Sequence, residues 1–265
     1  KRTKINLISQ KMISDIELEN LEFDYLETIS SILKANIRSN ILPALKSMNK
    51  ISKHWVNIKK DEDKGYDVGF ERVIYSLLQH GSSDLKHANS SPIGSDLMFE
   101  CDDAIIHIDL KSNQPLTNIG DHWQPKIEAN QTSYKIDYNK KGQGGTFAFE
   151  GNLPNYYEVN DGVTNKELPT LTYFISILYK VYQGECEIIN INVSCMPNGQ
   201  LSNVYGTEPI GAGGNISKKK CRFKMGRCKK FKLINKKRLN KIYVNKNYIE
   251  NNSIPSKTQF LKFLS

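Results

Sequence analysis

Apolar and polar positions alternate along two short runs in the first half of the chain. The runs cover residues 96–101 and 105–111, and their apolar positions are Leu97, Phe99 and Cys101, then Ile106, Ile108 and Leu110. Side chains of a β-strand repeat every second residue, so each run predicts a strand with one apolar face. Asp102 and Asp103 lie between the runs and favour a turn. The pattern therefore predicts a β-hairpin whose polar face carries His107, Asp109 and Lys111.

Ahead of this hairpin, apolar residues recur every three or four positions, which is the period of a helix. Ser14 and Glu17 have the spacing of a capping box, and Pro43 fits the first turn of a second helix. Residues 14–58 therefore predict two amphipathic helices that face a core. A shorter helix is expected next, with Glu71 at its start and an apolar side formed by Phe70, Val73, Ile74, Leu77 and Leu78.

The second half of the chain begins with a polar stretch and continues with two strands. Residues 113–134 lack periodicity and predict loops or short helices close to the hairpin. Residues 171–182 and 187–195 are rich in β-branched and aromatic side chains, which favour buried strands. Gln183-Gly184 is the expected turn between them.

Composition restricts the class of protein. A hydrophobic content of 38% with 25% charged residues is typical of a globular chain of 265 residues. No apolar run approaches the roughly 18 residues of a membrane span, and no signal peptide is visible, so a cytoplasmic protein without membrane contact is expected. Five scattered cysteines indicate reduced thiols, and their spacing does not suggest a zinc site.

Charge is distributed unevenly along the chain. Residues 216–265 hold 16 Lys or Arg and one acid, Glu250, for a net charge of +15, whereas the first 215 residues carry −6. Phe223 and Phe231 lie among these basic residues, and such a mixture suits phosphate contacts combined with stacking. The residues expected to contact DNA are Lys218, Lys219, Lys220, Arg222, Lys224, Arg227, Lys229 and Lys230. A solvated basic tail would have the same composition.

Two acids and a lysine converge on the polar face of the predicted hairpin. Asp109 and Lys111 must point the same way, and a hairpin beginning near Asp96 brings a second carboxylate close to Asp109. Paired carboxylates bind Mg²⁺ while leaving it several water positions, and a neighbouring lysine can orient a water or neutralise charge on a phosphate. A weak ion pair on a solvated strand edge is the alternative interpretation.

The arrangement resembles the PD-(D/E)XK nuclease motif. Asp96 takes the place of the first acid and Asp109-Leu110-Lys111 that of (D/E)-x-K, whereas Ser95 stands where the family usually has proline. The resemblance implies that Asp96 and Asp109 bind Mg²⁺ and that Lys111 acts on the attacking water or the transition state. It also implies a supporting role for Glu71, because the family often carries a glutamate on the preceding helix. An acid favoured by the dipole of the first helical turn is the alternative for Glu71.

The resemblance further implies an α/β fold with a mixed central β-sheet flanked by helices. Expected boundaries are an N-terminal helical region at 1–64, a nuclease core at 65–215 and a basic DNA-contacting region at 216–265. Within the superfamily the chain looks most like a bacterial type II restriction endonuclease, which implies a homodimer acting on double-stranded DNA. The N-terminal helices carry more apolar positions than one thin core needs, so they are the expected interface. Two alternatives stay open: a structure-specific or repair nuclease, and a non-catalytic nucleic-acid-binding protein.

Overall fold

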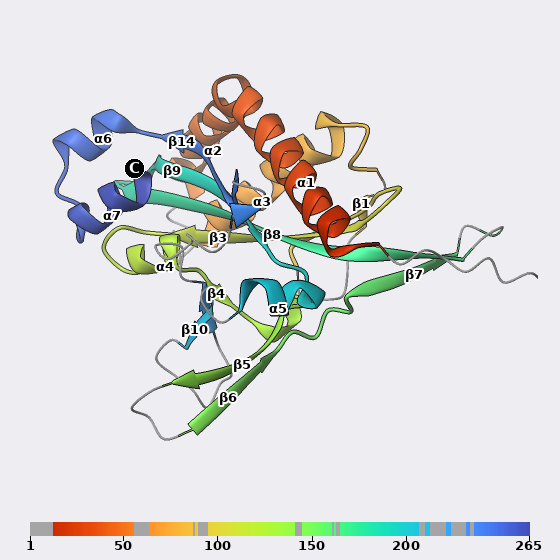
Figure 1. Cartoon of the computed structure of the whole chain (residues 1–265). Coiled ribbons are helices and arrows are strands. Elements are labelled where there is room, and N and C mark those ends of the chain that lie inside the picture. Colours follow the sequence, from red (N-terminus) through yellow and green to blue (C-terminus); the bar gives the residue numbers. More distant parts are fainter. Residues whose placement is uncertain are drawn as a thin grey trace, which may run out of the picture.

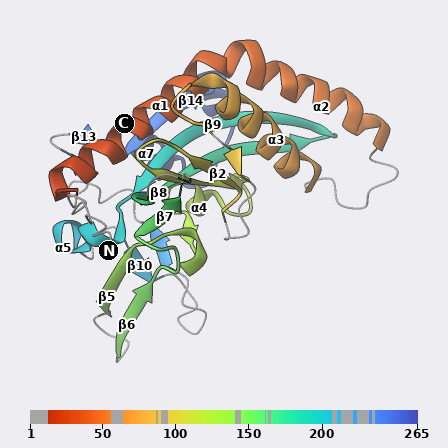
Figure 2. The same cartoon turned by 90° about the vertical axis from the view of Figure 1, so that its right-hand side faces the viewer.

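A layer of helices covers one face of a twisted central sheet (Figures 1 and 2). The computed structural model describes residues 13–55, 64–86, 88–89, 95–140, 145–160, 162, 165–206, 210–212, 221–223, 232–233 and 236–265. Within these residues the predicted α/β class with a mixed, helix-flanked sheet is confirmed.

The helical elements lie mainly at the two ends of the described chain. They are α1 (Asp15–Asn36), η1 (Ile37–Ile41), α2 (Leu42–Trp55), α3 (Lys64–Gly81), α4 (Ile119–Trp123), η2 (Ala129–Gln131), η3 (Gly199–Leu201), α5 (Ser202–Tyr205), α6 (Lys246–Asn251) and α7 (Lys257–Leu264). The strands are β1 (Ala88–Asn89), β2 (Leu97–Glu100), β3 (Ile105–Asn113), β4 (Lys126–Ile127), β5 (Lys135–Lys140), β6 (Gly145–Glu150), β7 (Tyr156–Asn160), β8 (Asn165–Tyr182), β9 (Glu185–Met196), β10 (Ile210–Ala212), β11 (Cys221–Phe223), β12 (Lys232–Leu233), β13 (Lys236–Lys237) and β14 (Leu239–Val244).

The central sheet is mixed and has the strand order β1-β2-β3-β8-β9-β14, with β7 paired to β8. The predicted hairpin is present as β2 and β3, and the predicted pair of central strands is present as β8 and β9, both pairs antiparallel. Strand β3 pairs with β8 in parallel. Among the described residues seven strands take part in this sheet, more than the hairpin and the two central strands that the sequence predicts.

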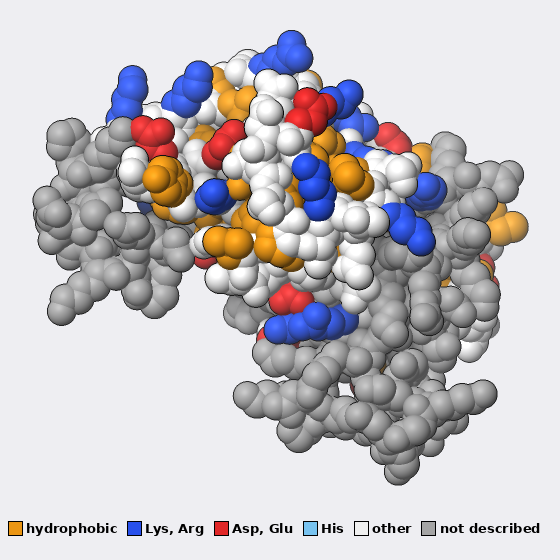
Figure 3. Space-filling model, turned by 90° about the vertical axis from the view of Figure 1, so that its left-hand side faces the viewer, with side chains coloured by type: hydrophobic (Ala, Val, Ile, Leu, Met, Phe, Trp, Pro, Cys, Tyr) orange, Lys and Arg blue, Asp and Glu red, His pale blue; other side chains and the backbone are white. Residues whose placement is uncertain are grey.

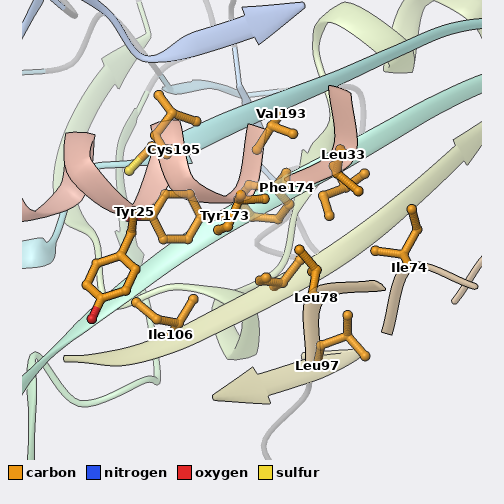
Figure 4. Close-up of a cluster of buried hydrophobic side chains, with 14 of the residues drawn as sticks. Tyr25, Leu33, Ile74, Leu78, Leu97, Ile106, Tyr173, Phe174, Val193 and Cys195 are labelled. Atoms are coloured by element: carbon orange, nitrogen blue, oxygen red, sulfur yellow. The ribbon is translucent and has the colours of Figure 1, made fainter. Parts of the chain in front are cut away.

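The two faces of this sheet differ in chemistry. The pairing of β3 with β8 places Ile106 beside Leu171, and Ile108 beside Tyr173, on one face. This face packs against α1 and α3 in the main core (Figure 4). The opposite face of the same strands is polar yet largely buried. Its buried polar side chains are His107, Asp109, Asn113, Thr170, Thr172, Ser176, Asn190, Asn192 and Ser194. The apolar face therefore anchors the sheet, and the polar face is available for chemistry.

The N-terminal helices form one nearly continuous helical stretch. The capping box predicted at Ser14 is confirmed, because its side chain accepts the Glu17 amide while Glu17 accepts the Ser14 amide. Two separate helices were expected, but α1 continues into α2 through the π-helical turn η1. Pro43 has no amide hydrogen for an ordinary helical bond, and the wider turn, in which Leu42 N–H donates to Ile37, accommodates it.

The basic C-terminal region contributes the edge strand β14 to the central sheet, where it pairs antiparallel with β9. Just before β14, the buried guanidinium of Arg238 forms an ion pair with the buried carboxylate of Glu22 in α1. Tyr205 accepts a hydrogen bond from the same guanidinium at 2.6 Å. The basic region is thus joined to the core through both a strand and a buried ion pair.

Three smaller sheets accompany the central sheet in the described part of the chain, and one of them is the short antiparallel pair of β12 and β13. Strands β5 and β6 form an antiparallel hairpin that projects away from the central sheet (Figures 1 and 2). The third small sheet has the order β10-β11-β4 and joins the basic region to the stretch that follows α4. The described part of the chain contains no helix long and apolar enough to cross a bilayer. Cys101, Cys186 and Cys195 are buried.

Candidate active site

The register of the β2–β3 hairpin brings Asp96 opposite Asp109. Leu97 pairs with Ile108, so the preceding residue, Asp96, lies across from the residue that follows Ile108. One carboxylate oxygen of Asp96 accepts a hydrogen bond from the Leu110 amide at 2.6 Å. This bond fixes the exposed Asp96 carboxylate at the end of the hairpin. The predicted convergence of Asp96 with Asp109 is therefore present.

Asp109 and Lys111 project from the same face of β3 and form an ion pair. Asp109 is only 3% exposed, and burial raises the pKa of its carboxyl to about 6, because desolvation outweighs the attraction of the Lys111 ammonium. The negative charge of Asp96 also raises this pKa. Lys111 further lies over the ring of Phe174 on β8, 5.8 Å from its centre. The site is a partly desolvated carboxylate–ammonium pair rather than a solvated edge.

Gln131, in the turn η2, links the two charged side chains. Its Nε2 donates to Asp109 Oδ1 at 3.0 Å, and its Oε1 accepts from Lys111 Nζ at 3.2 Å. The backbone N–H of Glu128 donates to the same Oε1 at 2.9 Å. In return, the Glu128 side chain accepts a hydrogen bond from the backbone N–H of Gln131. The sequence placed this segment near the hairpin but did not reveal the contact.

Glu71 lies in the middle of α3, so the prediction that it begins the helix is wrong. The interpretation of Glu71 as an acid held by the dipole of the first turn fails for the same reason. Burial raises the pKa of its carboxyl, and the charges of Asp96 and Asp67 raise it further. Glu71 is therefore close enough to Asp96 for their charges to interact, which is compatible with a supporting role.

Ser95, which stands where the nuclease motif usually has proline, contacts the same polar face. Its Oγ lies 2.8 Å from Nδ1 of His107, and the imidazole stacks on Tyr157 of β7 with ring centres 5.9 Å apart. Burial lowers the pKa of His107 to about 4, so the imidazole is neutral at neutral pH. Ser95 thus ties the chain just before Asp96 to strand β3, a restraint that proline could not supply through a side-chain hydrogen bond.

The donor set suits a hard divalent cation. Among the residues that the structure describes, no three His, Cys, Asp or Glu side chains are grouped so that they could hold a metal ion by themselves. Mg²⁺ does not require such a cage, because it retains several waters and binds through one or two carboxylates. Asp96 and Asp109 supply oxygens of this kind, and the absence of sulfur or imidazole ligands between them disfavours zinc.

Most of the residues predicted to contact DNA lie outside the described residues. These are Lys218, Lys219, Lys220, Lys224, Arg227, Lys229 and Lys230. The exception is Arg222 on β11, whose Nη1 pairs with Asp121 at 3.0 Å. Lys126 approaches the other oxygen of Asp121 at 3.5 Å, and Arg222 lies opposite Lys126 in the β11–β4 pairing. The basic segment is therefore attached to the strand that leads directly into Glu128 and Gln131.

Two protein-family models match the chain. The family model of the N-terminal domain of the type II restriction enzyme MwoI matches residues 14–183, and the model of the central domain of the same enzyme matches residues 188–244. No curated protein sequence matches significantly.

Two solved structures share the fold. The tetrameric restriction endonuclease SfiI, bound to cognate DNA, superposes with a TM-score of 0.66 at 16% identity, over 89% of this chain and 88% of SfiI. The restriction endonuclease BglI, bound to its DNA recognition sequence, gives a TM-score of 0.62 at 15% identity, over 86% of this chain and 91% of BglI. The MwoI models together span most of the described core, including every residue of the candidate site. The chain belongs to the family of the type II restriction enzyme MwoI and is a type II restriction endonuclease of the PD-(D/E)XK kind.

Proposed function

We propose that the chain is a Mg²⁺-dependent endonuclease that hydrolyses phosphodiester bonds of double-stranded DNA at a specific sequence. The observation that carries this proposal is the convergence of Asp96, Asp109 and Lys111 on one end of the β2–β3 hairpin. Family membership supports DNA cleavage, and the paired carboxylates support the choice of cofactor.

Each side chain has a separate task in this proposal. Asp96 and Asp109 would hold the metal, which would supply polarisation of a phosphoryl oxygen and a lower pKa for a bound water. Lys111 orients the attacking water or neutralises the charge that develops on the phosphate as the water oxygen bonds to phosphorus and the ester bond to the leaving oxygen breaks. Glu71 supports the site through the carboxylate of Asp96, with which its charge interacts.

The basic residues of 218–230 complete the proposal as DNA contacts. Strand β11, within this segment, pairs with β4, and β4 leads within a few residues to Gln131 at the candidate site. Lysines near this strand would lie beside the DNA phosphates that approach the acids. Contacts of this kind position a protein on DNA without reading its sequence. Specificity for a sequence therefore has to come from other residues.

The test is digestion of plasmid and bacteriophage DNA with Mg²⁺, which should give discrete fragments. Asp96→Asn, Asp109→Asn and Lys111→Met should each lower the cleavage rate by about a thousandfold or more, because each removes a charge that acts directly on the reacting phosphate. A single random smear from wild-type protein would contradict sequence specificity, and cleavage without divalent metal would contradict the cofactor.

Asp102→Asn is the matched control. Asp102 lies in the turn at the opposite end of the hairpin, is exposed and pairs with Lys86. The same chemical change at this position should leave cleavage within about twofold, since an exposed ion pair contributes little to stability. If Asp102→Asn and Asp109→Asn lost activity equally, the effect would come from the hairpin as a whole, and the assignment of Asp109 would fail.

A further inference from the structure

Gln131 is a neutral side chain that forms hydrogen bonds to both charged residues of β3, Asp109 and Lys111, and the proposed function gives it no task. It is 8% exposed and lies twenty positions after Lys111 in the chain. Its amide bridges Asp109 Oδ1, at 3.0 Å, and Lys111 Nζ, at 3.2 Å. A residue brought from such a distance to contact both members of an ion pair is a candidate for holding their geometry.

The orientation of the amide is determined by the backbone. The Glu128 N–H can only donate, so the Gln131 atom that it meets at 2.9 Å must be the carbonyl oxygen. The amide nitrogen then necessarily faces Asp109. A carboxylate accepts and an ammonium donates, so only a side chain with an acceptor and a donor side by side can serve both at once. Among neutral side chains of this length, glutamine alone meets that requirement.

The hydrogen bond from Gln131 uses only one carboxylate oxygen of Asp109 and leaves the second oxygen for a cation. Oδ1 is occupied by Gln131, whereas Oδ2 faces the Lys111 ammonium. A divalent cation held by Asp109 would repel the Lys111 ammonium from Oδ2, because both are positively charged. The side-chain carbonyl of Gln131 would then remain as a hydrogen-bond acceptor for Lys111. It lies on η2, which is braced by reciprocal bonds between Glu128 and Gln131.

We propose that Gln131 is a positioning residue that keeps the Lys111 ammonium beside Asp109 when that carboxylate binds the divalent metal. The role rests on the proposed function of Asp109 and Lys111 and deepens it. Gln131 itself touches neither the phosphate nor the metal. Its side-chain carbonyl stays hydrogen-bonded to Lys111 while the ammonium loses its contact with Asp109, so that the ammonium remains within the site.

Three variants separate this role from simple filling of space. Gln131→Met keeps the length and bulk but removes both hydrogen bonds, whereas Gln131→Glu keeps an acceptor for Lys111 and loses the donor to Asp109. Positioning predicts that the single-turnover cleavage rate falls in the order wild type, Gln131→Glu, Gln131→Met, with the last at least about tenfold slow. Space filling predicts that Gln131→Met cleaves like wild type and that the buried extra charge makes Gln131→Glu the slowest. Gln259→Met on α7 is the control, because its side chain is exposed.

A binding measurement tests the same role without cleavage. Calorimetric titration of the DNA-free protein with Mg²⁺ should show weaker binding in Gln131→Met by several-fold, because Lys111, deprived of its second acceptor, competes harder for Asp109. The loss should vanish in a Lys111→Met background, where there is no ammonium to position. An equal loss in both backgrounds, or none in either, would overturn the proposal.

The two measurements also separate this inference from the proposed function. If wild-type protein bound Mg²⁺ with the predicted Gln131–Lys111 coupling and yet cut no DNA, the nuclease assignment would fail while the positioning role remained. If wild-type protein cut DNA and Gln131→Met cut equally well, the positioning role would fail while the nuclease assignment remained.

Discussion

Asp109 holds a carboxylate in a place where ionisation is unfavourable. The residue is 3% exposed, and its attraction to Lys111 does not fully offset the loss of water. Groups that serve a reaction are often kept in surroundings that a purely structural residue would avoid. The candidate site therefore carries a cost in folding free energy that a substitution can reveal.

Asp109→Asn should stabilise the protein at neutral pH while it removes cleavage. The folded-state pKa of about 6 lies above the value of 3.8 for an unperturbed Asp, so ionisation favours the unfolded chain. This penalty develops as the pH rises from about 4 and is complete above about 6, where it amounts to up to about 3 kcal/mol. The difference in unfolding free energy between variant and wild type should thus grow with pH over this window in denaturant titrations. A variant less stable than wild type at pH 8 would show that the ion pair with Lys111 outweighs desolvation.

The residues of the site differ in how far the sequence reveals them. Asp96, Asp109 and Lys111 lie on one hairpin, where a period of two fixes which side chains share a face, so their convergence follows from local rules. Gln131 and Glu128 belong to a short turn in an aperiodic stretch. Nothing local determines where such a turn packs, and only the tertiary fold brings Gln131 to Asp109.

Two glycines pack closely against the backbone of residues 132–134, which follow Gln131. Gly151 donates its amide to Tyr134 at 3.0 Å, and a Cβ on Gly151 would lie only 2.0 Å from the Thr132 carbonyl oxygen. Gly199 approaches the same segment, since a Cβ there would lie 1.9 Å from the Ser133 carbonyl oxygen. Backbone packed this closely holds the position of the neighbouring Gln131.

Gly151→Ala should therefore disturb the site from outside it. The added methyl group overlaps main chain rather than a flexible side chain, so we expect the free energy of unfolding to fall by about 1–3 kcal/mol and cleavage to slow as the segment shifts. Gly120→Ala in α4 is the matched control, because a Cβ there meets nothing within 4 Å. It should be neutral or stabilising by up to about 1 kcal/mol. Equal effects of the two substitutions on denaturation and cleavage would contradict this account.

The sequence predicts the helices and strands that have a clear hydrophobic period, and it misses the strands that form through long-range pairing. The helices of residues 14–55, the hairpin and the strands β8 and β9 follow from strong periodicity. Strand β14 was not predicted because its polar and basic side chains resemble those of the segment before it. The pairing of β11 with β4 was not predicted either, because it joins three-residue and two-residue strands almost a hundred positions apart.

The whole molecule is divided in charge, with −6 on residues 1–215 and +15 on residues 216–265. Acids at the candidate site would repel a DNA phosphate in the absence of metal, so binding needs a compensating basic surface. On the face that carries α6 and α7, Lys and Arg side chains are scattered among apolar and acidic ones rather than gathered in one patch (Figure 3). The segment from 218 to 230 is therefore our candidate for that surface.

Replacing Lys218, Lys219 and Lys220 together with glutamine should weaken binding to all DNA sequences and flatten its salt dependence. Each phosphate contact contributes a slope of about −0.9 in log K against log salt, so the slope should change by up to about 3 units if all three lysines touch phosphate. Sequence preference should persist. The control replaces Lys246, Lys257 and Lys262 with glutamine, which removes the same amount of charge from α6 and α7. An effect confined to this control set would move the DNA-binding surface to those helices.

The homodimer stays a prediction, and the fold changes the argument for it. The sequence predicts the N-terminal helices as the interface because they carry more apolar positions than one thin core needs. In the structure Leu18, Leu26 and Ile29 pack into the core. Only Ile16 and Ile51 remain as exposed large apolar side chains among the described residues of α1 and α2. Two isolated side chains do not make an extended apolar interface.

The ion pair between Arg238 and Glu22 has a consequence for the order in which the protein is made. The two residues are 216 positions apart, so Glu22 leaves the ribosome long before its partner exists. Until Arg238 arrives, burial of Glu22 would leave an uncompensated charge, at a cost of about 3–5 kcal/mol. Strand β14, which covers the edge of β9, is synthesised later still. Nascent chains should therefore remain unable to close the core around Glu22 until Arg238 and β14 have been synthesised.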